Sequence, residues 1–80
     1  MTIKLSNYDV TLDPPSDDKP VQIGNNGKDP ISIYQKYSRP KVSDIHHMLL
    51  ARLQPDCVAV LVPESGAWRL DRIEQQPISD

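Results

Sequence analysis

The chain has 80 residues, of which eleven are acidic and nine basic, so its net charge at neutral pH is −2. This length allows one domain, and the charge argues against nonspecific nucleic-acid binding, which needs a dense cationic surface. The only cysteine, Cys57, excludes an internal disulfide and a four-cysteine zinc site. A lone thiol favours the reducing cytoplasm, and the low stability expected of so short a chain makes a homodimer a reasonable expectation.

The N-terminal part of the sequence predicts short strands and one long loop. Residues 2–12 alternate apolar and polar side chains in two registers that meet at Ser6-Asn7, which predicts one bulged strand or two short ones. The segment 13–20 has three prolines and four charged residues, cannot continue a strand ladder, and is predicted to be an exposed loop. A short strand over 21–23 and a longer one over 31–37 follow.

The segment IGNNGKDPIS (23–32) has the glycines and the lysine of a phosphate-binding loop. A Walker loop needs four residues between its glycines and then Lys followed by Ser or Thr at the start of a helix. Gly24 and Gly27 are instead two residues apart, and Lys28 precedes an aspartate. An Asn-Gly pair between two apolar segments predicts a hairpin turn, because both residues tolerate positive φ.

One stretch has a helical pattern, because its apolar residues recur at i, i+3, i+7 and i+11. This stripe consists of Val42, Ile45, Leu49 and Leu53. The pattern predicts a helix over about 43–54, ended by Pro55.

The C-terminal part predicts a hairpin and a free end. Residues 57–62 are apolar on both faces of a strand, 63–66 have the composition of a turn, and 68–73 alternate. The tail 75–80 is predicted to fray. The whole chain, 1–80, is thus predicted to be a single α+β domain with an antiparallel sheet of four to five strands, one helix on one face and a C-terminal hairpin. The longest apolar run is far shorter than the roughly 20 residues of a membrane-spanning helix, so no membrane association is expected.

Aromatic and basic residues form the most suggestive surface in the sequence. They are Tyr34, Lys36, Tyr37, Arg39 and Lys41, together with Trp68 and Arg69 on a predicted edge strand. Such residues are typical of hot spots in protein interfaces, and they also suit base stacking and phosphate contacts. The competing interpretation is that one tyrosine is buried, that the charges are only solvated, and that Trp68 fills a core without phenylalanine.

Metal and catalytic sites are not indicated. On a helix, His46 and His47 would point about 100° apart, so they would not share a metal easily. Cys57 opens an apolar strand, where a buried thiol is the usual role. A metal or thiol site joining His46 to Cys57 is a third hypothesis. Because neither the spacing of the histidines nor the setting of Cys57 suits metal binding or catalysis, we expect no catalytic residue, metal or cofactor.

The leading hypothesis is a small, cytoplasmic, non-enzymatic protein-binding module, a regulator or inhibitor that docks on a larger protein or complex. The alternative is a nucleic-acid-binding module that uses residues 34–41. The sequence does not identify the partner.

Overall fold

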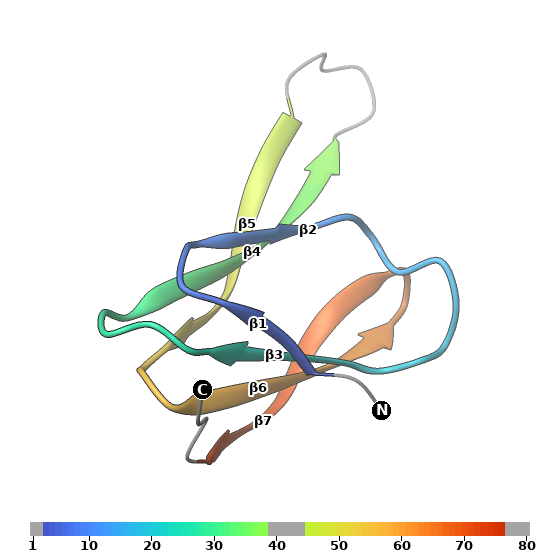
Figure 1. The fold of residues 1–80 in the computed structure, drawn as a ribbon. Coiled ribbons are helices and arrows are strands. Elements are labelled where there is room, and N and C mark those ends of the chain that lie inside the picture. The colour runs from blue at the N-terminus through green and yellow to red at the C-terminus, as the bar shows by residue number, and fades with distance from the viewer. Residues whose placement is uncertain (1–2, 39–44, 77–80) are drawn as a thin grey trace.

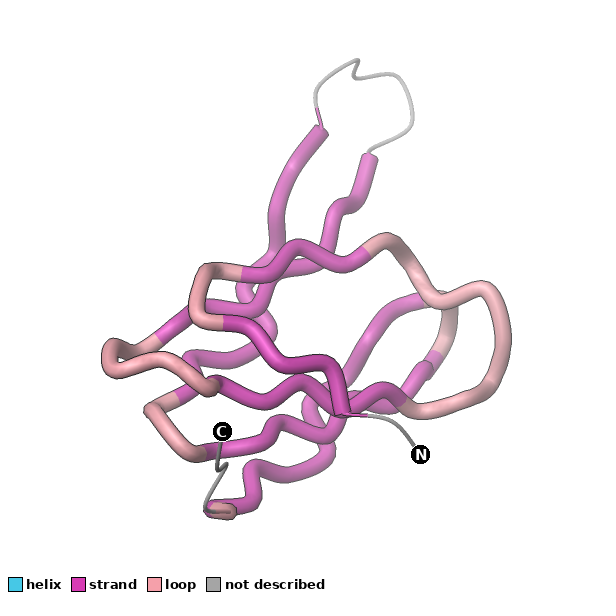
Figure 2. Tube along the Cα trace, in the orientation of Figure 1, coloured by secondary structure: helices cyan, strands magenta, loops and turns pink. Residues whose placement is uncertain are grey.

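The protein is described by a computed structural model over residues 3–38 and 45–76, which form strands and loops (Figures 1 and 2). The seven strands of these residues are β1 (Ile3–Ser6), β2 (Val10–Leu12), β3 (Val21–Asn25), β4 (Ile31–Ser38), β5 (Ile45–Leu53), β6 (Cys57–Glu64) and β7 (Ala67–Gln75). One sheet has four strands in the order β1-β3-β6-β7, and the other has three in the order β2-β4-β5. The predicted α+β class is therefore wrong, since the described residues are all-β. They contain no helix that is long and apolar enough to cross a membrane.

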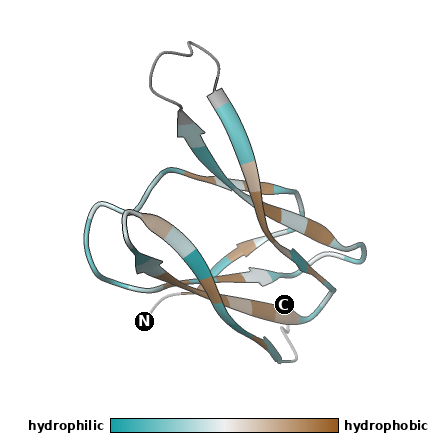
Figure 3. Ribbon diagram, turned by 180° about the vertical axis from the view of Figure 1, so that it is seen from behind, coloured by the Kyte–Doolittle hydropathy of each residue, from teal (hydrophilic) through white to brown (hydrophobic). Residues whose placement is uncertain are grey.

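The core lies between the two sheets and is entirely aliphatic. Its buried cluster draws on both sheets and consists of Ile23, Ile31, Ile33, Ala51, Leu53, Ala59 and Leu61. Hydrophobic residues concentrate along the middle of the strands, while the connecting loops are mainly hydrophilic (Figure 3). Partly buried residues, Trp68 and Leu70 among them, pack against this cluster from β7.

The N-terminal segment belongs to both sheets. β1 pairs with β3 and β2 pairs with β4, in both cases in parallel. Between them, the Ser6 hydroxyl donates to the carbonyl of Tyr8 at 2.8 Å and accepts from the Tyr8 amide at 3.1 Å, which closes a tight local turn. The change of register in the sequence therefore marks a corner between sheets, and the prediction of two short strands is the right alternative.

β6 lies in the middle of the larger sheet, as its apolar sequence predicts, and four successive residues of it, 58–61, are buried. The expected C-terminal hairpin is present, because β6 and β7 pair antiparallel from Cys57 with Gln75 to Glu64 with Ala67. Ser65 and Gly66 form its two-residue loop with φ of 54° and 79°. Positive φ at both positions is the geometry of a type I′ turn, whose twist matches that of paired strands.

The predicted helix over 43–54 is wrong where the structure describes it, because β5 pairs antiparallel with β4 over Ile45–Leu53. The start of that prediction, with Val42 of the stripe, lies outside the described residues. The ladder shifts register between Ile33, opposite Ala51, and Tyr34, opposite Leu49, so Leu50 is an extra residue that forms a β-bulge. Of the predicted stripe, Leu53 is buried but Leu49 is 58% exposed. The bulge interrupts the alternation of buried and exposed side chains that is expected of a strand. The sequence of β5 therefore lacks a strand pattern, and the spacing of its leucines resembles that of a helix.

The predicted hairpin turn at Asn26-Gly27 is also wrong. β3 and β4 lie in different sheets, and neither residue of the pair is among the described residues with positive φ. The loop instead carries the chain from one sheet to the other. Gly27 is needed for space, because a Cβ atom there would lie 2.8 Å from the Cβ atom of Asn7.

The buried side chain of Asn25 organises this loop. Its amide nitrogen donates to the carbonyls of Asp29 at 2.8 Å and Leu53 at 3.0 Å. Its side-chain oxygen accepts from the Gly27 amide at 2.9 Å, and its backbone carbonyl accepts from the Asp56 amide at 3.0 Å. A single side chain thus joins the β3–β4 loop to the end of β5.

The predicted loop 13–20 connects β2 to β3 without a strand. The predicted frayed tail, 75–80, overlaps the last residue of β7, and 77–80 lie outside the described residues.

Candidate functional site

The part of β4 and β5 farthest from the core is the main candidate surface. β2 accompanies β4 only as far as Gln35, which pairs with Leu12. Beyond this point β4 and β5 pair only with each other, and Figure 1 shows them rising past β2. We call the described residues 34–37 and 46–49 the arm, which thus begins at the last two residues of β4 that pair with β2. The molecule is correspondingly elongated, with principal extents of 45 × 25 × 16 Å.

The outer face of the arm combines aromatic, basic and apolar side chains. Because side chains alternate along a strand and Gln35 points into the molecule, Tyr34 and Lys36 share the solvent-facing side. Tyr34 pairs with Leu49 and Lys36 with His47 across the ladder. The rings of Tyr34 and His47 are 6.3 Å apart and tilted by 42°. Leu49, at 58% exposed, gives this face an uncovered apolar group.

The opposite face of the arm continues the inner side of the smaller sheet. Tyr37 stacks on His46 with ring centroids 5.4 Å apart and an interplanar angle of 28°. Met48, opposite the buried Gln35, is 39% exposed. This face therefore changes from buried to open along the strand, since nothing in the described residues covers Met48 fully.

Trp68 connects the base of the arm to the larger sheet. Its backbone amide donates to the side-chain oxygen of Gln35 at 2.7 Å, and its indole nitrogen donates to the carbonyl of Asp13 at 2.8 Å. The side chain is half-buried and packs against the core cluster. Its position favours a structural role rather than one at an interface.

The aromatic and basic residues of the sequence do not form one surface. Tyr34 and Lys36 lie on the outer face of the arm, and Tyr37 lies on the other face. Arg69 is on β7, where its Nε lies 2.7 Å from a carboxylate oxygen of Glu64. The two remaining candidates, Arg39 and Lys41, lie outside the described residues.

His47, Met48 and Leu49 are the arm residues that sequence reasoning missed as surface candidates. It assigned them to a helix, and as helical residues they had no common surface with the tyrosines. The alternation of 31–37 on the neighbouring strand carried no information about which segment pairs with it. Only a strand assignment for 45–53 would have brought these side chains beside Tyr34 and Tyr37.

A site that joins His46 to Cys57 is not supported by the arrangement. β5 rises by about 3.3 Å per residue, which places His46 roughly 20 Å from Leu53, and Cys57 lies beyond the following turn. Cys57 is a free, half-buried thiol that packs against the core. In the described residues no three His, Cys, Asp or Glu side chains are grouped as a metal site would need.

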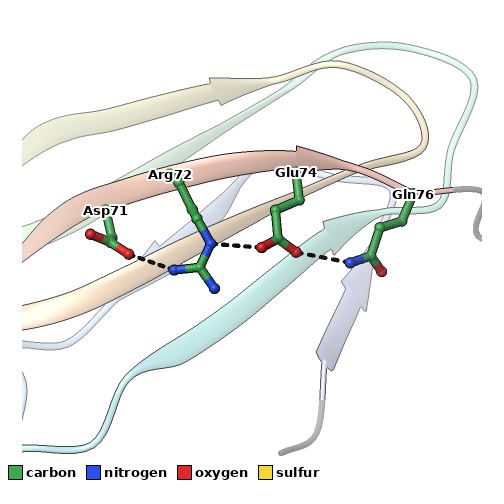
Figure 4. Close-up of polar contacts among 4 residues, drawn as sticks. All are labelled: Asp71, Arg72, Glu74 and Gln76. Carbon is green, nitrogen blue, oxygen red and sulfur yellow. Dashed lines mark hydrogen bonds and ion pairs between the residues drawn. The ribbon is translucent and has the colours of Figure 1, made fainter.

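Polar and charged side chains at the end of β7 are joined in a continuous network of hydrogen bonds and ion pairs (Figure 4). Arg72 donates from Nε to Glu74 and from a terminal nitrogen to Asp71, both at 2.6 Å, and Gln76 donates to Glu74 at 2.9 Å. The hydrogen bond to Glu74, followed by that to Asp71, raises the pKa of Arg72, and the hydrogen bond from Arg72 lowers the pKa of Glu74. Both residues therefore stay charged at neutral pH.

The arm is much less charged than β7. Its only side chain with a lysine, arginine or carboxylate group is Lys36, whose Nζ lies 3.8 Å from an Asp13 carboxylate oxygen.

Comparison of the chain with protein-family models, with curated proteins and with solved structures finds no match.

Proposed function

We propose that this protein is a small, non-enzymatic binding module that docks on a larger protein or complex through the arm and regulates or inhibits it. The observation that carries the proposal is that both faces of the arm expose apolar and aromatic side chains. Leu49 and Met48 are 58% and 39% exposed, and they flank two tyrosine–histidine ring pairs. Tyrosines backed by apolar groups supply large contact areas at low entropic cost, which is why they are frequent in interface hot spots.

A protein partner fits the charges better than a nucleic acid does. Nucleic-acid affinity comes largely from cations that neutralise phosphates. Lys36 lies beside Asp13, Arg69 beside Glu64, and Arg72 between Asp71 and Glu74. These carboxylates would compete with phosphates. Nucleic-acid binding through residues 34–41, of which Tyr34 and Lys36 lie on the outer face of the arm, is kept as the alternative. We place the protein in the cytoplasm because of its single free thiol.

The three tyrosines of the chain supply both the test and its control. Tyr34 and Tyr37 lie on the arm, whereas Tyr8 is 75% exposed in the loop between β1 and β2. Tagged wild-type protein should capture one protein from native extract in a fixed ratio. Tyr34→Ala and Tyr37→Ala should each weaken this capture by about 10-fold or more, the loss typical of a hot-spot tyrosine. Tyr8→Ala should not.

Equal capture by all three variants would remove the arm from the proposal. Recovery of nucleic acid that is released by moderate salt would favour the alternative, because phosphate contacts weaken steeply with salt concentration. Far-UV circular dichroism of each variant should match that of the wild type, which confirms that the fold is intact.

A further inference from the structure

Three of the four sheet edges are protected against strand addition. β1 has four residues, among them the exposed Lys4, and β2 has three residues followed by Pro14 and Pro15. β7 is longer but carries Arg69 and the network of Asp71, Arg72 and Glu74. Short strands, prolines and charges are the usual features that prevent one sheet edge from pairing with another.

The fourth edge, that of β5, lacks these features in its outer half. β5 ends the order β2-β4-β5, and among the described strands it pairs in a ladder with β4 alone. Residues 46–50 are His, His, Met, Leu and Leu, with no carboxylate, ammonium or guanidinium group. Met48 and Leu49 on this stretch are among the exposed large hydrophobic residues. An uncharged edge with apolar side chains is able to accept a further strand.

We propose that this edge pairs antiparallel with the same edge of a second copy of the chain. The pairing would join two three-stranded sheets into one sheet across a two-fold axis. A second copy is the occupant that the charges favour, because it brings an equally uncharged strand, and in an isologous interface each copy uses the same surface. The protein needs no other partner for this contact, so the inference goes beyond the proposed docking function, although both use Met48 and Leu49 of the arm.

The composition of the edge favours a register centred on Met48. In this register Met48 lies opposite Met48 of the second copy, and His47 lies opposite Leu49 of the second copy. Directly opposed residues of an antiparallel pair lie on the same face, about 4.5–5.5 Å apart, so side chains at these positions touch. The exposed groups of Met48 and Leu49 are thereby covered, and no like charges meet at neutral pH.

The size of the edge sets the strength of the dimer. The five paired residues, 46–50, extend over about 17 Å. Such a contact falls below the roughly 1,200 Å² that stable interfaces bury, which predicts a dissociation constant in the micromolar range. Sedimentation velocity of the purified protein should show monomer near about 1 μM and dimer above about 100 μM.

Substitutions at Met48 test the edge and its register together. Met48→Lys and Met48→Glu each place two like charges opposite one another, so each protein alone should remain monomeric at all these concentrations. An equimolar mixture should form a heterodimer at least as tight as the wild-type dimer, because the charges become complementary. Leu5→Lys introduces the same charge at a residue of β1 that is 52% exposed, and it should leave dimerisation unchanged.

A wild-type protein that stays monomeric above about 100 μM would overturn the inference. It would also be overturned by a dimer that persists in Met48→Lys, or by a mixture of the two charged variants that stays monomeric. Leu49→Lys, at a more exposed position, replaces Met48→Lys if circular dichroism shows that the latter is unfolded. The docking proposal has a separate test, capture of a different protein and its loss in the tyrosine variants, so the failure of one proposal can be told from the failure of the other.

Discussion

Asn25 shows how much one buried polar side chain contributes to this fold. It is completely buried, and its amide makes three hydrogen bonds to backbone groups of Gly27, Asp29 and Leu53. Asn25→Ala should lower the free energy of unfolding by about 3 kcal/mol, because it leaves buried donors and acceptors without partners. Urea denaturation followed by circular dichroism measures this loss.

The matched control is the next residue. Asn26 is exposed, and the hydrogen bond from its backbone amide to Ser6 does not depend on its side chain. Asn26→Ala should therefore change stability by less than about 0.5 kcal/mol. Similar losses in both variants would contradict the role given to Asn25. Nothing in the sequence separates these two asparagines, because the difference comes from the end of β5, 28 residues further along the chain.

At the scale of elements, the sequence identified three strands well, from alternation in two of them and from a continuous apolar run in the third. β4, β6 and β7 follow the predicted segments closely, because their patterns depend on local burial. β5 was missed because Leu49 and Leu53 are four residues apart, as on one face of a helix, although the bulge at Leu50 leaves Leu53 buried and Leu49 exposed. The leucines, methionine and alanine of β5 also favour helices intrinsically. Pairing with β4 overrides that preference.

The same error explains why the candidate site was predicted only in part. Tyr34 and Tyr37 were identified by residue type, but alternation along β4 puts them on opposite faces. Their neighbours on the arm come from β5, so a correct surface required the correct partner strand. For the Asn-Gly pair, a short-range turn signal was misleading because β3 and β4 diverge into different sheets.

The turn between β6 and β7 supports a prediction at this scale. Ser65 has a φ of 54°, which an asparagine tolerates better than a serine does. Ser65→Asn should raise the free energy of unfolding by about 0.5 kcal/mol. Gly66→Ala should lower it by about 1 kcal/mol, since an alanine is strained at positive φ. Thermal denaturation of both variants measures the changes.

The loss expected for Gly66→Ala can be assigned to its backbone conformation. A Cβ atom at Gly66 would meet no atom within 4 Å, so steric clash does not contribute to the loss. Ser16→Asn, an exposed change in the loop 13–20, should leave stability unaltered. If Ser65→Asn is destabilising, the turn is not of the I′ type in solution.

At the scale of the whole molecule, the order of the strands had no signal in the sequence. The two parallel pairs, β1 with β3 and β2 with β4, each join strands that are separated in the chain by one other strand. The N-terminal segment therefore contributes one strand to each sheet. In addition, Asn25 joins the loop after β3 to the turn after β5 by hydrogen bonds. The two sheets should therefore not unfold separately.

Trp68 reports on this cooperativity, because it is the only tryptophan and contacts three parts of the fold. It lies on β7, its amide donates to Gln35 on β4, and its indole donates to Asp13 after β2. Any separation of the sheets would expose the indole, whereas circular dichroism follows all strands together. We predict that urea transitions monitored by tryptophan fluorescence and by far-UV circular dichroism coincide, as two-state unfolding requires. A fluorescence transition at lower urea would show that β7 separates from the smaller sheet before the strands unfold. The hydrogen bonds of Trp68 to Gln35 and Asp13 would then be too weak to join the sheets.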